Sequence, residues 1–171
     1  MESLNGFQTN VWGPMMWTFL HMSTLNYNPS RKKEYMIFFK SLSSILPCGA
    51  CRTNYKNIIT GKEYKTKLSN DKFKSRESIS LWLFYLHNAV QREIYKKTHN
   101  KFDQPKYTDS KKDFKIAMST YELFRAKCSE KSYGCTIPEK GGRKRAEIHI
   151  KKRARYPTCR KDSIVIHNNC K

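Results

Sequence analysis

Apolar residues recur along most of the chain at the three- and four-residue spacing of amphipathic helices. The first such segment begins near Pro14, and proline is well tolerated in the first turn of a helix. One face of this helix is predicted to carry Trp17, Leu20, His21 and Thr24. No convincing strand pattern precedes residue 136, so the predicted fold class is all-α.

Two further helices are predicted over residues 31–44 and 52–60. Ser30 is suited to cap the first of them, Pro47 ends it, and Gly61 ends the second. The apolar positions of these helices are Tyr35, Phe38, Phe39, Leu42 and Ile45, followed by Tyr55, Ile58 and Ile59. We expect these side chains to face the core.

A basic connector over residues 62–75 leads to a long helix over about 75–97. A loop containing Pro105 then leads to a fifth helix over about 109–127. The inward positions are predicted to be Ile79, Trp82, Leu83, Leu86, Val90 and Ile94, then Phe114, Ala117, Met118, Tyr121 and Phe124. The chain therefore reads as a set of five helices.

The C-terminal extension, residues 137–171, differs in composition from the preceding domain, residues 1–136. From residue 139 onward it has eleven Lys and Arg against three Asp and Glu, in a chain of net charge +20. Short strands are predicted at 147–150 and 163–167, but the extension is otherwise too polar to have much regular structure. No apolar run reaches the roughly 18 residues of a membrane span, and the N-terminus has no secretory signal.

The C-x-x-C motif of Cys48 and Cys51 is the strongest candidate for chemistry, because it stands where a helix is predicted to begin. A thiolate in the first turn of a helix faces unpaired N–H groups, which lower its pKa. Two cysteines at this spacing can also close into a disulfide, so the motif favours dithiol exchange. Six cysteines without a signal peptide are more typical of catalytic, metal-bound or free thiols than of a secreted scaffold.

Three other interpretations of the cysteine pair remain open. Half of a zinc site would need more ligands, and Cys128 with Cys135 lacks a compact zinc spacing. The same holds for Cys159, His167 and Cys170. A thioredoxin-like fold would need a strand before the motif, where a helix is predicted. The pair can also be two ordinary core thiols.

Two aromatic segments that end in histidine flank the cysteine motif in the sequence. Trp17 and His21 lie one helical turn apart and share a face, and Trp82 shortly precedes His87 and Asn88. Aromatic faces can pack on a flat ring system while His and Asn bind its edges, so beside a dithiol this combination is typical of a flavin site. The alternative is a helical bundle with ordinary core aromatics and buried histidines.

Together these residues resemble the Erv/ALR family of FAD-linked sulfhydryl oxidases. The matching motifs are W-G-P-x-x-W-x-x-L-H over residues 12–21, P-C-x-x-C over 47–51 and R-x-x-x-x-x-W-L-x-x-x-H-N-x-V over 76–90. Their order and separation agree as well, and the match spans about residues 9–97. The W-G-P form is most similar to the members encoded by large cytoplasmic DNA viruses.

The resemblance implies a four-helix bundle that holds FAD at its mouth, with a fifth helix alongside, and a head-to-tail homodimer. It assigns Cys51 as the thiol beside the flavin and Cys48 as the thiol that exchanges with substrate. Gln91 stands where the family usually has Asn, and retains an amide that is one methylene longer. The residues assigned to FAD binding are Gly13, Trp17, His21, Trp82, His87, Asn88, Val90, Gln91 and Lys96. No metal is implied.

The resemblance further implies that protein dithiols reduce the disulfide and that electrons pass through FAD to O2, giving hydrogen peroxide. The substrate would be a protein dithiol, for which a thioredoxin-like carrier is one candidate. Family members often carry a second, shuttle dithiol, and the candidates here are Cys128, Cys135, Cys159 and Cys170. Likeness to viral members implies the host cytoplasm or the virion as the location.

A binding module is the rival class of function. The basic runs at residues 141–145 and 151–155 suit phosphate neutralisation, so a nucleic-acid partner is a secondary expectation. Tyr156 is the one aromatic residue beside these runs, which does not support sequence-specific binding of single strands. In this reading the cysteines would be structural or bind zinc.

Overall fold

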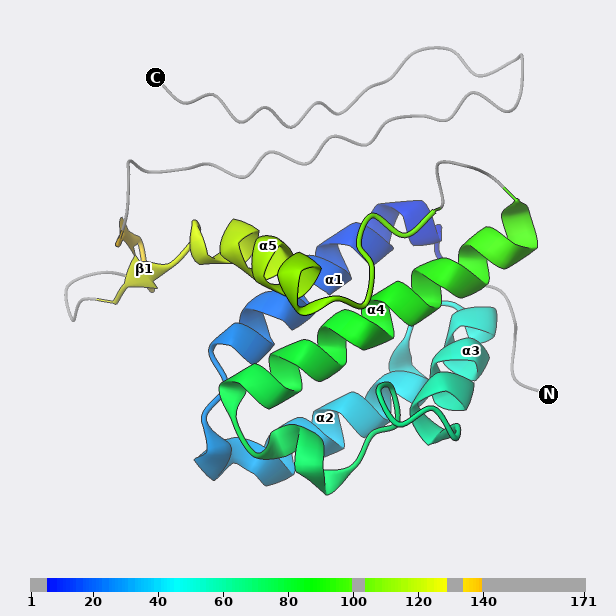
Figure 1. Ribbon diagram of the computed structural model, residues 1–171, viewed down its shortest axis with the longest axis horizontal. Coiled ribbons are helices and arrows are strands. Elements are labelled where there is room, and N and C mark those ends of the chain that lie inside the picture. Colours follow the sequence, from blue (N-terminus) through cyan, green and yellow to red (C-terminus); the bar gives the residue numbers. More distant parts are fainter. Residues whose placement is uncertain (1–5, 100–103, 129–133, 140–171) are drawn as a thin grey trace, which may run out of the picture. The chain divides into compact units, whose positions relative to one another are not determined.

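The computed structural model describes residues 6–99, 104–128 and 134–139 (Figure 1). Its helices are α1 (Thr9–Leu25), α2 (Lys32–Ile45), α3 (Gly49–Thr60), α4 (Arg76–Thr98) and α5 (Lys111–Glu122), with short 3-10 turns η1 (Pro29–Arg31) and η2 (Asn70–Phe73). Two-residue strands β1 (Ala126–Lys127) and β2 (Ile137–Pro138) follow. The prediction of an all-α fold with five helices is confirmed for the described part of the chain.

The chain divides into two compact units, the first ending at Tyr121 and the second beginning at Glu122. The first unit carries the helices, and the second carries β1 and β2, which pair antiparallel. The basic runs, the strands predicted beyond residue 140, and Cys159 with Cys170 lie outside the described residues. The domain boundary placed after residue 136 stays a prediction.

The core of the first unit is built by α1 to α4 around Trp82, whose ring packs edge-on against Phe39 at 4.8 Å between centroids. The indole nitrogen of Trp82 donates a hydrogen bond of 2.9 Å to the carbonyl of Thr66, so its one polar atom is satisfied. A second apolar cluster joins α4 to α5, where Phe84 packs with Ala117 and Met118. Among the described helices, none combines the length and apolar character needed to cross a membrane.

Local capping sets where the helices near the candidate site begin. Cys48 is the N-cap of α3, and its sulfur accepts a hydrogen bond from the Cys51 N–H at 3.2 Å. Ser75 caps α4 by accepting from the Ser78 N–H at 3.1 Å. His99 ends α4 in the left-handed region, with φ of 49°. The fourth helix therefore begins within one residue of its predicted start, and the third begins at the cysteine motif, three residues before the predicted residue 52.

Helix ends account for most of the differences from the sequence-based expectations. Pro14 lies inside α1, which begins at Thr9. The expected N-cap at Ser30 is wrong, because Ser30 lies within η1 and donates its backbone N–H to the Asn28 side chain at 3.0 Å. The fifth helix ends at Glu122 rather than near 127, where the chain leaves the helix to form β1.

Three side chains expected in the core are exposed instead. Ile45 is 61% exposed because it is the last residue of α2, and Leu46 is buried in its place. Ile94 is 44% exposed, since α4 has 23 residues and is longer than every helix it packs against. Phe124 lies beyond α5 and is 42% exposed.

Candidate functional site

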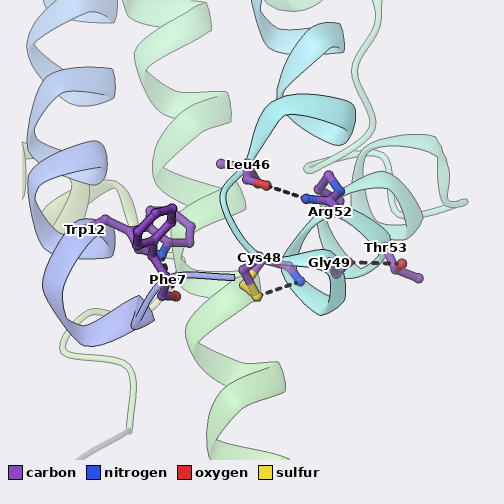
Figure 2. The surroundings of a disulfide bond; sticks show 8 residues. Phe7, Trp12, Leu46, Cys48, Gly49, Arg52 and Thr53 are labelled. Atoms are coloured by element: carbon purple, nitrogen blue, oxygen red, sulfur yellow. Dashed lines mark hydrogen bonds between the residues drawn. A yellow bond between two sulfur atoms is a disulfide. The ribbon is translucent and has the colours of Figure 1, made fainter. Parts of the chain in front are cut away.

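Cys48 and Cys51 form a disulfide at the N-terminus of α3, with their Cα atoms 5.1 Å apart (Figure 2). Both residues are half-buried. The preceding turn is held by the Arg52 guanidinium, which donates to the Leu46 carbonyl at 2.8 Å, and by the Cys48 N–H, which donates to the same carbonyl. After reduction, a thiolate at this position would face the positive end of the helix, which favours its ionised and reactive form.

The N-terminal segment runs directly beside this disulfide (Figure 2). The Phe7 N–H donates to the Pro47 carbonyl at 2.8 Å, and the Trp12 indole donates to the Phe7 carbonyl at 3.1 Å. A Cβ on Gly6 would lie within 2.8 Å of the Cys48 Cα, so this close approach requires glycine. Sequence reasoning did not find this contact, because no local pattern links residues 6–7 to residue 47.

His21 of α1 and His87 of α4 form a hydrogen bond between their rings, with His21 Nε2 and His87 Nδ1 3.1 Å apart. Trp17 stacks on the ring of His87 at 4.0 Å and 9°. The amide nitrogen of Gln91 lies 3.3 Å from His87 Nε2. The structure thus brings together four of the predicted site residues from two helices.

Both histidines are held in the neutral form. Burial, followed by the nearby His87, lowers the pKa of His21 to about 3, and burial lowers the pKa of His87 to about 4. With Gln91 donating to His87 Nε2, the His87 proton sits on Nδ1 and is donated to His21 Nε2. His21 then carries its own proton on Nδ1, a buried atom with no hydrogen-bond partner among the described residues. A buried donor without a partner is costly and suits a ligand that supplies an acceptor.

Tyr121 of α5 packs on one member of the histidine pair. Its ring stacks on His21 at 5.0 Å and 23°. Burial, followed by the neighbouring Tyr107, raises the pKa of Tyr121 above its ordinary value. The sequence placed Tyr121 on the apolar face of a helix, but gave no signal that it meets a histidine 100 residues earlier. The rings of Trp17, His21, His87 and Tyr121 together offer flat aromatic surfaces beside an unsatisfied N–H.

The remaining predicted cofactor residues lie in different surroundings. Trp82 is 1% exposed in the core and is not brought to the histidine pair. The Asn88 amide donates to the Thr108 carbonyl at 3.4 Å and to Asp109 at 3.0 Å. Val90 is half-buried, and Lys96 is exposed and pairs with Glu93 at 2.9 Å. A Cβ on Gly13 would meet nothing within 4 Å, so open space adjoins that position in α1.

The disulfide and the aromatic residues are linked through the core of the first unit. Cys51, Trp12 and Trp17 all pack against the buried cluster of α1 to α4. A separate cavity of about 390 Å³ lies between α3 and α4, lined by Asn54, Asn57, Ile58, Gly61, Lys62, Glu63, Thr66, Ala89, Arg92 and Glu93. None of the predicted site residues lines that cavity. Within the described ranges, no group of three or more His, Cys, Asp or Glu is arranged to hold a metal ion.

Cys128 and Cys135 form a second disulfide, in the second compact unit. It connects the two short strands, whose register pairs Ala126 with Pro138 and Lys127 with Ile137. The sequence left the pairing of these cysteines open, and the structure pairs them with each other.

Comparison with known proteins identifies the class to which this fold and site belong. The chain belongs to the Erv1 / Alr family, whose model matches residues 14–117. The resemblance drawn from the three sequence motifs is therefore confirmed.

Two relatives are similar to this chain over about half of its length. The "Probable FAD-linked sulfhydryl oxidase R368" of Acanthamoeba polyphaga mimivirus is 38% identical over 90 residues, which are 50% of this chain and 60% of that protein. The "FAD-linked sulfhydryl oxidase ERV1" of Arabidopsis thaliana is 32% identical over 88 residues, which are 49% of this chain and 42% of that protein. The match thus covers less than two thirds of either relative.

Proposed function

We propose that this protein is an FAD-dependent thiol oxidase that forms disulfides in protein dithiols. The observation that carries the proposal is the neutral His21–His87 pair with its unsatisfied His21 N–H, in a bundle whose core also holds Cys51 of a helix-terminal disulfide. Membership in the Erv1 / Alr family and the printed names of both relatives support the same activity.

The residues present fit FAD. The Nδ1–H of His21 offers a buried donor to an acceptor on the cofactor, and Trp17 and Tyr121, stacked on the two histidines, add aromatic rings that can line a flat ring system. Gly13 leaves open space beside α1, and Lys96 offers a cation to a phosphate. The residues proposed to hold the cofactor are Gly13, Trp17, His21, His87, Asn88, Val90, Gln91 and Lys96, with Trp82 supporting them from the core. FAD would supply the capacity to take two electrons from a dithiol and pass them to O2.

The disulfide performs the exchange with substrate. A substrate thiolate attacks the sulfur of Cys48, which breaks the Cys48–Cys51 bond and forms a mixed disulfide between substrate and Cys48. Cys51 leaves as a thiolate at the N-terminus of α3, where the helix stabilises its charge. The second substrate thiol then attacks the substrate sulfur of the mixed disulfide and releases Cys48. The substrate has lost two electrons and two protons, and the protein dithiol has gained them.

In the proposed cofactor site, the two histidine rings form an uncharged surface and do not supply a positive charge. The lowered pKa values keep both rings uncharged at physiological pH, with the proton of His87 held on Nδ1. His21 is therefore always available as a donor through Nδ1. Burial of these rings also excludes water from this side of the site.

Further properties follow the same proposal. The dithiol substrate is a protein, with a thioredoxin-like carrier as one candidate, the electron acceptor is O2 and the product is hydrogen peroxide. A head-to-tail homodimer is proposed from the resemblance to the family, and a location in the host cytoplasm or virion is proposed from the likeness to a mimivirus protein. Cys128 and Cys135 are proposed as a shuttle pair, together with Cys159 and Cys170 outside the described residues. Binding of nucleic acid stays a secondary prediction, since its basic runs also lie outside them.

Reconstitution tests the activity directly. The full chain should bind FAD in a ratio near one per chain, consume O2 when given a reduced protein dithiol, and release hydrogen peroxide. With a small dithiol such as dithiothreitol, Cys128→Ser should retain the rate, because the small substrate reaches Cys48 without a shuttle. The proposal is contradicted if the wild-type protein binds no FAD. It is also contradicted if the Cys48→Ser variant oxidises dithiols as fast as the wild type.

A further inference from the structure

The carboxylate of Asp109 fastens the segment that leads into α5 to α4. Asp109 accepts a hydrogen bond from the Asn88 amide at 3.0 Å and from the Arg92 guanidinium at 3.1 Å. The ammonium of Lys65, in the connector after α3, lies 3.9 Å from the other oxygen of Asp109. One side chain therefore joins three segments that are distant in sequence.

The Asn88 amide is buried and therefore needs the acceptors that Asp109 and Thr108 supply. Asn88 is 2% exposed, and its amide nitrogen donates both to Asp109 and to the backbone carbonyl of Thr108. Without these acceptors the Asn88 amide would be buried and unsatisfied, which costs more than the loss of an exposed hydrogen bond. The side chain of Asp109 is 23% exposed, so its charge contacts are only partly screened by water.

The direction of α5 is fixed immediately after this anchor. Asp113 donates its backbone N–H to the Ser110 hydroxyl at 3.0 Å. Its carboxylate accepts from the Thr108 N–H at 2.7 Å and from the Thr108 hydroxyl at 2.5 Å. These bonds resemble a capping box, in which side chains satisfy the free donors at a helix start. Asp109 stands between Thr108 and Ser110, so the anchor and the cap form one rigid turn.

The helix that starts at this turn carries Tyr121 to the histidine pair. Phe114 packs edge-on against Phe84 of α4 at 5.6 Å, and Tyr121, two turns further on, stacks on His21 at 5.0 Å. Tyr121 is at the end of α5, where small rotations about the anchor produce the largest displacements. The position of the Tyr121 ring therefore depends on how firmly the start of α5 is held.

We propose that Asp109 is a positioning residue that, through Asn88 and Arg92, anchors α5 to α4 and keeps Tyr121 stacked on His21 as one wall of the cofactor site. The anchoring of α5 stands on the contacts of the chain itself. The identification of the wall with an FAD site rests on the proposed function.

Hydrogen exchange of the full-length protein tests the anchor without reference to any cofactor. Asp109→Ala is expected to speed exchange of the α5 backbone amides by roughly ten- to a hundredfold, because a partly buried, charge-assisted network is lost. The amides of α1 to α4 should keep their protection. Asp109→Asn retains a side-chain acceptor for Asn88 but loses the negative charge. It should therefore increase the exchange rate of the α5 amides by less than Asp109→Ala does. Glu34→Gln is the control, since Glu34 is exposed and pairs only on the surface with Arg31.

A double-mutant cycle on FAD affinity tests whether Asp109 acts through Tyr121. Tyr121→Leu should weaken FAD binding while leaving exchange at the start of α5 unchanged. Asp109→Ala should weaken binding as well, and the double variant should bind no more weakly than Tyr121→Leu alone. If the loss of FAD affinity in the double variant equals the product of the losses in the two single variants, the positioning role is overturned. The role is also overturned if the α5 amides of Asp109→Ala or Asp109→Asn exchange at the same rate as those of Glu34→Gln. Failure of the wild type to bind FAD would instead overturn the proposed function, while the exchange result would still decide the anchor.

Discussion

His21 Nε2 lies 3.1 Å from His87 Nδ1, and this bond joins the first helix of the bundle to the fourth through two uncharged rings. A hydrogen bond between two imidazoles needs one donor and one acceptor, so at least one ring must be neutral. Burial makes the charged form of either ring unfavourable. The pair is therefore both a structural link and a source of pH dependence.

The stability of the fold should fall as the pH falls below the ordinary range of histidine. The pKa of His21 drops from 6.5 in the unfolded chain to about 3, and that of His87 to about 4. Between these limits the unfolded state binds protons that the native state does not, so stability is fully present above about pH 6.5 and is lost progressively below it. From pH 6.5 to pH 5, each histidine should lower the free energy of unfolding by about 1.6 kcal/mol.

Chemical denaturation at a series of pH values measures this slope. The pKa of Asp109 is lowered, so the stability that its carboxylate contributes is lost only at more acidic pH. The change in stability from pH 6.5 to pH 5 therefore reports the contribution of the histidines. His87→Asn should remove about half of the slope in that interval. A slope that is unchanged in this variant would show that the pair is not held neutral.

The two cysteines of the disulfide should have different roles. Cys51→Ser should abolish turnover, because no thiolate can then pass electrons to the cofactor. Cys48→Ser should block exchange with substrate while FAD remains bound. Dithiol consumption and bound flavin, measured on the same samples, separate the two effects. Turnover at the wild-type rate in either variant would contradict these assignments.

Two glycines should respond in opposite ways to the same substitution. Gly6→Ala places a Cβ within 2.8 Å of the Cys48 Cα, so the N-terminal segment must move and lose its bond to Pro47. We expect a loss of about 0.5–1.5 kcal/mol of stability and faster reduction of the Cys48–Cys51 disulfide by dithiothreitol. The measurements are denaturant unfolding and reduction kinetics.

Gly13→Ala is the matched case, because a Cβ there meets nothing and the residue lies inside α1. We expect a gain of about 0.5–1 kcal/mol in the stability of the protein without added FAD, from the better helix propensity of alanine. Weaker FAD binding in the same variant would support a place for Gly13 beside the cofactor. If Gly6→Ala is as stable as Gly13→Ala, the N-terminal segment does not contact the disulfide as described.

Helical periodicity was enough to predict the five helices, since each helix has an apolar face whose spacing is set within the helix itself. It was not enough for their ends. Ile45 and Ile94 continue the apolar pattern, yet both side chains are exposed among the described residues. Helix ends depend on tertiary partners, and periodicity carries no information about the length of those partners.

The motifs found the residues of the site but not their surroundings. Trp82 and His87 fall in one motif, but five positions at about 100° per residue place them about 140° apart around the helix. Trp82 accordingly turns into the core while His87 meets His21. Tyr121 and Asp109 could not be found in the same way, because their contacts to His21 and Asn88 join distant parts of the chain.

The visible absorption spectrum of the purified protein, before and after a dithiol is added in air, tests the central claim most directly. The proposed function predicts a flavin spectrum that bleaches or gains a long-wavelength band on addition of the dithiol, then recovers as oxygen is consumed. Cys51→Ser should retain the flavin spectrum but show neither change. A colourless protein that cannot be reconstituted with FAD would contradict the proposed function.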